Sequence, residues 1–161
     1  MEPNFSIIKG TRHVGLVCSD IEKSVKFYEE LGFVSESTPK EESGIKAEFL
    51  VGIEKVIYKT VKLHLAHDKS TLWQESGFRL ELVEYIYPKS EFARNFDNNI
   101  IGKVHLCFTV TQIEKVIMKV IKNGGFSPFN QVLDISGTHK YVYVFDPDKN
   151  PLELAENLNK S

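Results

Sequence analysis

The stretch HVGLVCSDIEK at residues 13–23 aligns without gaps with HLCFTVTQIEK at residues 105–115. Continuing at the same spacing pairs Gly32 with Gly124, and each glycine is closely followed by phenylalanine. Self-similarity at a fixed spacing is the signature of an internal repeat. We therefore expect the chain to contain two copies of one structural unit.

A second match links the ends of the two copies. The segment FRLELVEY at residues 78–85 aligns with NPLELAEN at residues 150–157 and sets Glu81 opposite Glu153. Each half of the chain thus begins with a histidine and ends with a glutamate.

Local patterns predict what each copy contains. The runs 12–18 and 104–110 are short, apolar and rich in β-branched residues, which is typical of strands. Each run precedes an apparent capping box, Ser19 with Glu22 and Thr111 with Glu114, and then an amphipathic segment that ends near glycine, which indicates a helix. Further strands are expected at residues 47–51, 61–66 and 78–85, and at residues 126–132, 140–145 and 152–156.

The predicted order is therefore βαβββ, twice. This gives an α+β fold in which tandem modules form a curled mixed sheet around a cavity. We expect a single domain, 1–161, with modules at residues 11–87 and 103–157 and a linker at 88–102. The segment 40–44 is expected to be an exposed loop.

Composition limits the possible partners. The chain has 161 residues, enough for one domain, and its net charge of -2 comes from 20 basic and 22 acidic side chains. This balance lacks the basic footprint of a nucleic-acid or membrane-surface binder. The two cysteines, Cys18 and Cys107, lie in apolar runs and are expected to be reduced core thiols, which favours the cytoplasm.

Alternation along the strands assigns the polar residues to one face. Side chains two apart share a face of a strand, so His13, His105, Glu81 and Glu153 should all point away from the helices. If a pseudo-twofold axis relates the modules, these four groups can converge in one cavity. Two buried carboxylates need compensation, and a divalent cation held by two imidazoles and two carboxylates would provide it.

The simpler interpretation of each residue alone is structural. A single histidine in an apolar strand is more often a hydrogen-bonded core residue than a metal ligand. A glutamate between leucines can lie at a solvated edge, as we expect for Glu84 and Glu156. The recurrence of both residue types at equivalent places in two copies favours the metal site.

These segments resemble the vicinal oxygen chelate superfamily, which includes glyoxalase I, bleomycin-resistance proteins and extradiol dioxygenases. The resemblance also involves FDPDKNPLELAE at residues 145–156 and covers nearly the whole chain. It implies that His13, Glu81, His105 and Glu153 are the ligands of one divalent metal ion: Ni, Zn, Co, Fe or Mn.

The resemblance also implies a chemistry. Glyoxalase I and methylmalonyl-CoA epimerase remove a proton next to a metal-chelated carbonyl and stabilise the resulting enediolate or enolate. By this analogy Glu153 is the catalytic base, and Glu81 is a metal ligand and second catalytic carboxylate. The expected substrate is a small oxo or thioester compound, with a thiol conjugate as one option, although Val17 stands where bacterial-type glyoxalases carry a glutathione-binding arginine.

Two other functions remain open at this point. His13, His105 and Glu153 alone would form the two-His-one-carboxylate triad of an Fe(II)-dependent ring-cleaving dioxygenase, provided that Glu81 turns away. A metal-free drug-binding resistance protein would use the same cavity without needing the four ligands.

Four more residues are candidates for binding substrate. Arg79 shares a face with Glu81, Tyr141 and Tyr143 alternate along one strand, and Cys107 lies two residues after the second histidine. The simpler interpretations are an exposed arginine at a strand start for Arg79, core packing for Tyr141 and Tyr143, and a small buried thiol for Cys107. A homodimer is also expected, and whether the site lies within one chain or across two stays open.

Overall fold

The computed structural model describes residues 11–66, 78–91, 101–128 and 131–159. Its elements, in chain order, are β1 (Val14–Val17), α1 (Ile21–Glu30), β2 (Phe33–Ser35), β3 (Lys40–Ser43), α2 (Ile45–Val51), β4 (Ile57–Leu65), β5 (Arg79–Tyr87), β6 (Leu106–Thr109), α3 (Ile113–Lys122), β7 (Leu133–Ile135), β8 (His139–Phe145) and β9 (Pro151–Asn157). Within these described segments, none of the helices has the length and apolar character needed to cross a membrane.

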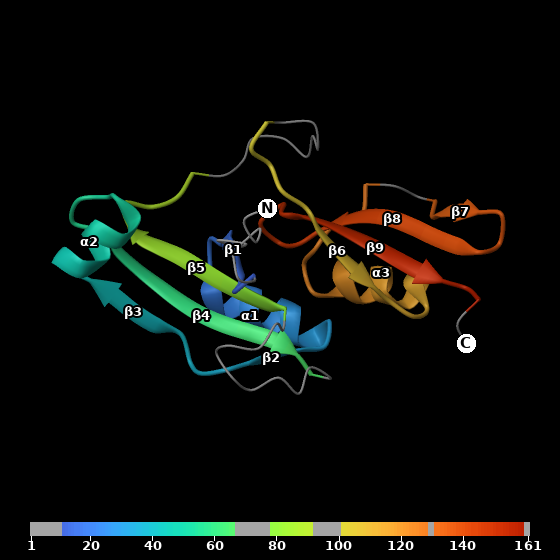
Figure 1. Cartoon of the computed structure of the whole chain (residues 1–161), viewed down its shortest axis with the longest axis horizontal. Helices are drawn as coiled ribbons and strands as arrows, with labels where there is room; N and C mark the ends of the chain where they lie inside the picture. Colours follow the sequence, from blue (N-terminus) through green and yellow to red (C-terminus); the bar gives the residue numbers. More distant parts are fainter. Residues whose placement is uncertain (1–10, 67–77, 92–100, 129–130, 160–161) are drawn as a thin grey trace, which may run out of the picture.

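The strands form two mixed sheets with the same internal order. In the first, β1 runs parallel to β5, which pairs with β4, and β4 pairs with both β2 and β3. In the second, β6 runs parallel to β9, followed by β8 and β7. Figure 1 shows the sheets side by side, with β1 and β6 toward the middle of the molecule. The predicted α+β fold with mixed sheets is confirmed.

Three local predictions were wrong. Residues 47–51, expected as a strand, belong to helix α2, and the expected loop at 40–44 contains strand β3. In the segment 126–132, of which residues 129 and 130 lie outside the described part of the chain, Phe126 makes an isolated bridge to Phe145, and the following described strand begins at Leu133.

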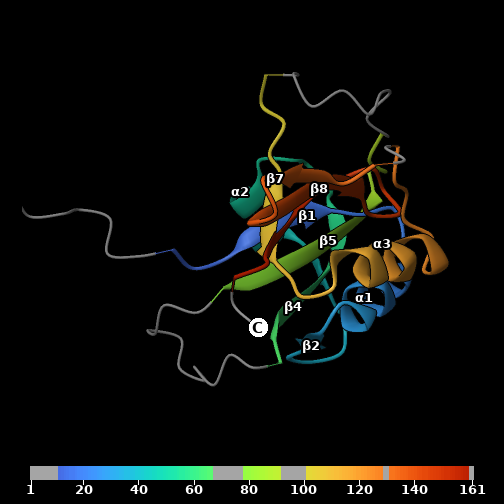
Figure 2. The same cartoon turned by 90° about the vertical axis from the view of Figure 1, so that its right-hand side faces the viewer.

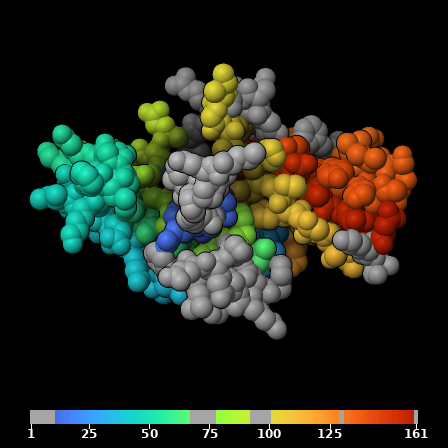
Figure 3. Space-filling model, in the orientation of Figure 1, coloured from blue at the N-terminus to red at the C-terminus, as the bar shows by residue number. Residues whose placement is uncertain are grey.

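Backbone pairing and glycine explain the first two differences. β3 has four exposed residues and is held by its backbone register with β4, which an alternation of side chains cannot reveal. Helix α2 lies between Gly44 and Gly52, both with positive φ, and buries only Ala47. Phe49 on α2 is 91% exposed. In Figure 3 this helix forms one end of the molecule and the β7–β8 segment the other.

The two modules share one hydrophobic core. Leu80 and Leu82 of β5 are fully buried toward the helices, and one cluster continues through Leu106, Val144 and Leu152 of the second module. Figure 2 shows α1 and α3 next to each other on the same side of the sheets. The predicted alternation of buried and polar strand faces is confirmed for β1 and β6.

Close approach of the modules requires glycine at position 125. A Cβ built there would lie 2.5 Å from the Phe145 carbonyl oxygen and 2.9 Å from the Phe27 ring. The hydrogen bond from Lys119 Nζ to the Glu30 carbonyl, at 3.0 Å, links the two helices nearby.

Carboxylates from the strands cap the N-termini of helices α1 and α3. Glu84 accepts a hydrogen bond from the backbone N–H of Ile21 at 3.1 Å, and Glu156 accepts from the N–H groups of Gln112 and Ile113. The predicted capping boxes were wrong, because Asp20 is the N-cap of α1 and Gln112 makes no side-chain cap. The expectation that Glu84 and Glu156 lie at solvated edges was also wrong. Their negative charge satisfies the orphan amides and the helix dipole instead.

The turn between β8 and β9 joins the two modules. Asp146 is 2% exposed and accepts hydrogen bonds from Tyr28 Oη at 2.9 Å and from the backbone N–H groups of Asp148 and Asn150 at 2.9 and 2.8 Å. Asp148 in turn accepts from the Ser19 backbone N–H at 2.9 Å. Burial, and then the charge of Asp146, raise the pKa of Tyr28 well above its usual value, so the phenol stays protonated and donates.

We expect Asp146→Ala to lower the free energy of unfolding by about 3 kcal/mol, because it leaves one buried donor and several partly buried donors without an acceptor. Tyr28→Phe should cost only about 1 kcal/mol, since it removes one hydrogen bond. Urea unfolding followed by circular dichroism measures both, with exposed Glu54→Ala as the control. A D146A variant as stable as the control would contradict the role given to this turn.

Candidate metal centre

The first predicted pair of ligands lies together on the first sheet. His13 directly precedes β1, and the parallel register of β1 and β5 sets Gly15 beside Glu81. His13 Nε2 lies 3.2 Å from Glu81 Oε2. Both groups lie on the side turned away from the helices. We call this side of each sheet the outer face; it carries Lys62 and Glu81 in the first sheet, and Cys107, Tyr143 and Glu153 in the second.

The second pair repeats this geometry. His105 directly precedes β6, and the register of β6 and β9 sets Cys107 beside Glu153. His105 Nε2 lies 3.2 Å from Glu153 Oε2, the same separation as in the first pair. The equivalence seen in the sequence therefore extends to the arrangement of the side chains.

Each pair fits two neighbouring positions around a metal ion. Two ligand atoms bound at ~2.1 Å and at right angles to each other are ~3 Å apart. The His Nε2 to Glu Oε2 separations of 3.2 Å lie close to that value. One imidazole nitrogen and one carboxylate oxygen also form a donor set that transition metals accept.

One chain keeps the two pairs apart. All four residues lie in the described segments, and within those segments no three His, Cys, Asp or Glu side chains gather closely enough to hold one ion. The structure thus brings His13 to Glu81 and His105 to Glu153, but it does not bring the two pairs into one group.

A donor from the neighbouring strand accompanies each glutamate. Lys62 of β4 is the register partner of Glu81, with its Nζ 3.5 Å from Glu81 Oε1. Tyr143 of β8 is the register partner of Glu153, and its hydroxyl donates to Glu153 Oε2 at 3.3 Å. Sequence reasoning missed Lys62, because its place depends on the pairing of β4 with β5; the alternation of Lys62 with buried Val61 and Leu63 was the available signal.

Arg79 is ion-paired within the first sheet. Its Nε donates to Glu36 Oε1 at 2.8 Å, and its side chain is only 13% exposed. His64 Nδ1 lies 3.8 Å from the same oxygen of Glu36. Arg79 shares the outer face with Glu81, as expected, but a carboxylate of the chain already balances its charge.

The two cysteines differ in their exposure to solvent. Cys18 is buried as expected, and burial raises its pKa to about 12. Cys107 is exposed, so its prediction as a core thiol was wrong. Its strand neighbour on the outer face is Glu153, and partial desolvation followed by this carboxylate raises the Cys107 pKa.

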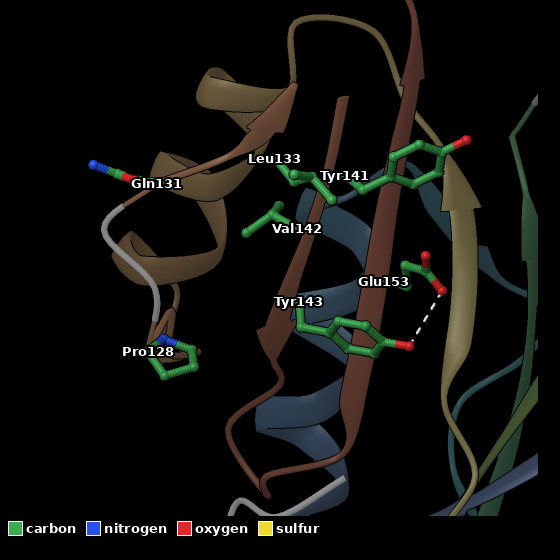
Figure 4. Close-up of a pocket in the computed structure, with 7 residues that line it drawn as sticks. All are labelled: Pro128, Gln131, Leu133, Tyr141, Val142, Tyr143 and Glu153. Atoms are coloured by element: carbon green, nitrogen blue, oxygen red, sulfur yellow. Dashed lines mark hydrogen bonds between the residues drawn. The ribbon is translucent and has the colours of Figure 1, made fainter. Parts of the chain in front are cut away.

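A cavity of about 730 Å³ opens beside Glu153. Figure 4 labels its lining, which includes Leu133, Tyr141 and Tyr143. The view shows Tyr143 and Glu153 turned toward each other, with their hydrogen bond dashed. Burial, and then Glu153, raise the Tyr143 pKa, so the phenol remains a donor. The lining is mainly apolar and aromatic, with a carboxylate at one side, as in many small-molecule sites.

Comparison with known proteins gives one family. The model of the Glyoxalase/Bleomycin resistance protein/Dioxygenase superfamily matches residues 10–154. A Bacillus subtilis relative, described as uncharacterized protein YwkD, is 29% identical over 152 residues, which are 93% of this chain and 98% of that protein.

Solved structures show the same fold. A glyoxalase family protein from Bacillus cereus superposes with a TM-score of 0.81 at 18% identity, covering 97% of this chain and 99% of its own. Glyoxalase I from Zea mays superposes with a TM-score of 0.59 at 17% identity, covering 92% of this chain and 47% of the maize chain.

Proposed function

Because this chain belongs to the Glyoxalase/Bleomycin resistance protein/Dioxygenase superfamily, we propose that it is a divalent-metal-dependent, glyoxalase-like lyase or isomerase. The observation that carries the proposal is the pair of equivalent His–Glu contacts, both at 3.2 Å, on the outer faces of the two sheets. The maize neighbour of the same fold is a glyoxalase I, which supports this class of reaction.

The complete site would form between two copies of the chain. Each chain offers two ligand pairs that do not gather into one group among its described residues. A homodimer in which the His13–Glu81 pair of one copy meets the C-terminal pair of the other would unite four ligands, twice. Such a twofold arrangement uses the same surfaces on both copies, as closed dimers do.

The four side chains suit Ni, Zn, Co, Fe or Mn. When bound, the ion would polarise the substrate carbonyl and stabilise the negative charge that develops on its oxygen. Glu81, held by Lys62 on one oxygen, would act as the steady ligand. Glu153 would accept the proton from the carbon next to that carbonyl and return it to the neighbouring carbon or the opposite face.

Tyr143 would assist Glu153. Its hydroxyl already donates to Glu153 Oε2 at 3.3 Å and would keep the carboxylate aligned as the proton arrives. The cavity beside it would receive the remaining part of the substrate, and its apolar lining would exclude water from the reacting carbon.

The contact between Glu81 and His13 favours four ligands over the dioxygenase triad. A triad needs Glu81 turned away, whereas its Oε2 lies 3.2 Å from the His13 nitrogen. A metal-free binding protein would leave the matched geometry of both pairs without a purpose.

Titration of the metal-free protein with Co²⁺ by calorimetry tests the proposal. We expect about one ion per chain, because a twofold dimer has two sites. The Co²⁺-loaded protein should also catalyse exchange of deuterium from D₂O into hydroxyacetone or the hemithioacetal of methylglyoxal, and EDTA should abolish the exchange. A purified protein that binds no Co²⁺, Ni²⁺ or Zn²⁺ would contradict the proposed function.

A further inference from the structure

We propose that the exposed apolar side of helix α2 docks on the outer face of strand β7 of a second copy of the chain. The partner's α2 would thereby complete one wall of the cavity beside Glu153. The docking rests on the proposed function, because it needs the dimer in which unlike modules meet. It needs no metal ion and uses none of the four proposed ligands.

Helix α2 turns large apolar side chains to solvent. Phe49 is 91% exposed, Ile45 84% and Leu50 76%. Ala47 is buried on the other side of the helix, and with about 3.6 residues per turn Ile45 and Phe49 fall on the side opposite to it. Apolar side chains exposed next to one another mark a surface that binds a partner.

The helix lies on the outer face of the first sheet. Ala47 belongs to a small apolar cluster that includes Val83 and Tyr85 of β5. These two side chains share a face with Glu81 and alternate with Leu82, which is fully buried toward the helices. The apolar side of α2 therefore projects from the same side of the molecule as Glu81.

Strand β7 has a second apolar surface on the outer face of the second sheet. Leu133 is 62% exposed and Ile135 47%. Leu133 is the register partner of Tyr141, which alternates with buried Val142, so Leu133 and Ile135 lie on the outer face. Leu133 and Tyr141 both line the cavity, and Figure 4 shows them beside each other.

The two apolar surfaces suit one twofold contact. Both lie on the outer faces, and α2 and the β7–β8 segment form opposite ends of the molecule in Figure 3. A twofold axis through the middle of this side would set each α2 on β7 of the other copy, so that both surfaces are covered in both copies. A contact of α2 with α2 would leave both β7 surfaces exposed.

The available area is sufficient for a specific dimer. At about 150 Å² for a large apolar side chain, the exposed fractions of Ile45, Phe49, Leu50, Leu133 and Ile135 amount to roughly 500 Å² in each chain. Two copies would bury about 1,000 Å² through these side chains alone, the area at which specific protein interfaces begin. A second copy of the chain therefore fits these surfaces.

Docking would change the cavity. Its volume is about 730 Å³, and Leu133 forms part of its wall. The partner's Phe49, packed on Leu133 and Tyr141, would add an aromatic ring to this wall and exclude water from the space beside Glu153. Each cavity would then contain side chains of both copies.

Sedimentation equilibrium of the metal-free protein in EDTA tests the docking. We expect a wild-type dimer, and self-association at least about 100-fold weaker in Phe49→Glu and in Leu133→Lys, because each dimer loses two contacts. The double variant F49E/L133K should associate more tightly than either single variant, since opposite charges then meet. Met118→Glu, at a 62% exposed position on α3, is the matched control and should remain dimeric.

Binding of N-phenyl-1-naphthylamine tests the effect on the cavity, because the fluorescence of this probe rises in an apolar site. At a concentration where the wild-type protein is dimeric and F49E is monomeric, F49E should bind the probe at least about fivefold more weakly than the wild type or M118E. Circular dichroism checks that each variant is folded.

Four results would contradict parts of this proposal or of the proposed function. A monomeric wild-type protein, or F49E and L133K as dimeric as the control, would overturn the docking. A double variant as weak as the single variants would show that α2 does not meet β7, and unchanged probe affinity in monomeric F49E would show that α2 does not form a cavity wall. A dimer that dissociates as expected but binds no Co²⁺ would contradict the proposed function alone.

Discussion

We expect the variants His13→Ala and His105→Ala each to lose their bound Co²⁺, and an equimolar mixture of the two, unfolded and refolded together, to regain part of it. This is the result expected if each site takes one His–Glu pair from each of two copies. In a mixed dimer, one site receives both substitutions and the other receives neither. The mixed dimer therefore holds one ion at a complete wild-type ligand set.

The amount of Co²⁺ that the refolded mixture should bind can be calculated. Random exchange makes half of the dimers mixed, so the refolded mixture should hold about a quarter of the Co²⁺ that the wild-type protein holds per chain. Metal analysis after gel filtration measures this fraction. Refolding each variant alone is the control and should give no ion. If the mixture also gives none, the site shared between two copies is wrong.

Glu153→Gln is expected to slow deuterium exchange into substrate by about 10³-fold or more, because an amide cannot accept the proton. The amide oxygen can still bind the ion, so Co²⁺ should remain bound, though more weakly. The exchange assay by NMR, at Co²⁺ concentrations that saturate each variant, separates proton transfer from metal loss.

Glu81→Gln is the matched comparison. Since Glu81 is proposed as the steady ligand, this change should slow exchange only about tenfold once the ion is restored. Tyr143→Phe should have an intermediate effect, because it removes the donor that aligns Glu153. If E81Q is slower than E153Q at saturating Co²⁺, the roles of the two glutamates are reversed.

The equivalence of the two His–Glu contacts could be predicted from the repeat, whereas the expected convergence of all four side chains is not seen among the described residues of one chain. His13 and His105 head matching strands, and Glu81 and Glu153 lie in matching final strands. Residues in equivalent places of a duplicated unit have equivalent neighbours, so the alignment predicted that the two halves would show the same arrangement, and the two contacts of 3.2 Å do match. The alternation of β5 also predicted correctly that Leu80 would be buried.

Strand β3, the helix-capping glutamates and the position of Lys62 depend on contacts between distant parts of the chain, which local sequence patterns do not predict. Strand β3 is exposed along its whole length and exists because β4 is long enough to pair with it. Glu84 and Glu156 looked like edge residues, yet each reaches a helix that lies more than 40 positions away in the chain. Lys62 acquires its partner only through the register of two strands.

The sequence also cannot predict whether the two His–Glu pairs come together. The alternation of side chains placed all four ligands on the same kind of face, but it contains no information on the relative placement of the two sheets. That placement depends on the shared core, on Gly125 between the helices and on the Asp146 turn. These contacts are long-range and arise from packing rather than from periodicity.

The unequal partners of the two glutamates have a consequence for which of them acts as the base. Two identical half-sites would bind an asymmetric molecule equally well in either of two orientations, and either glutamate could then accept the proton. An ammonium beside Glu81 and a phenol beside Glu153 make the two orientations unequal in energy. The duplicated fold can thereby give two carboxylates of common origin different tasks.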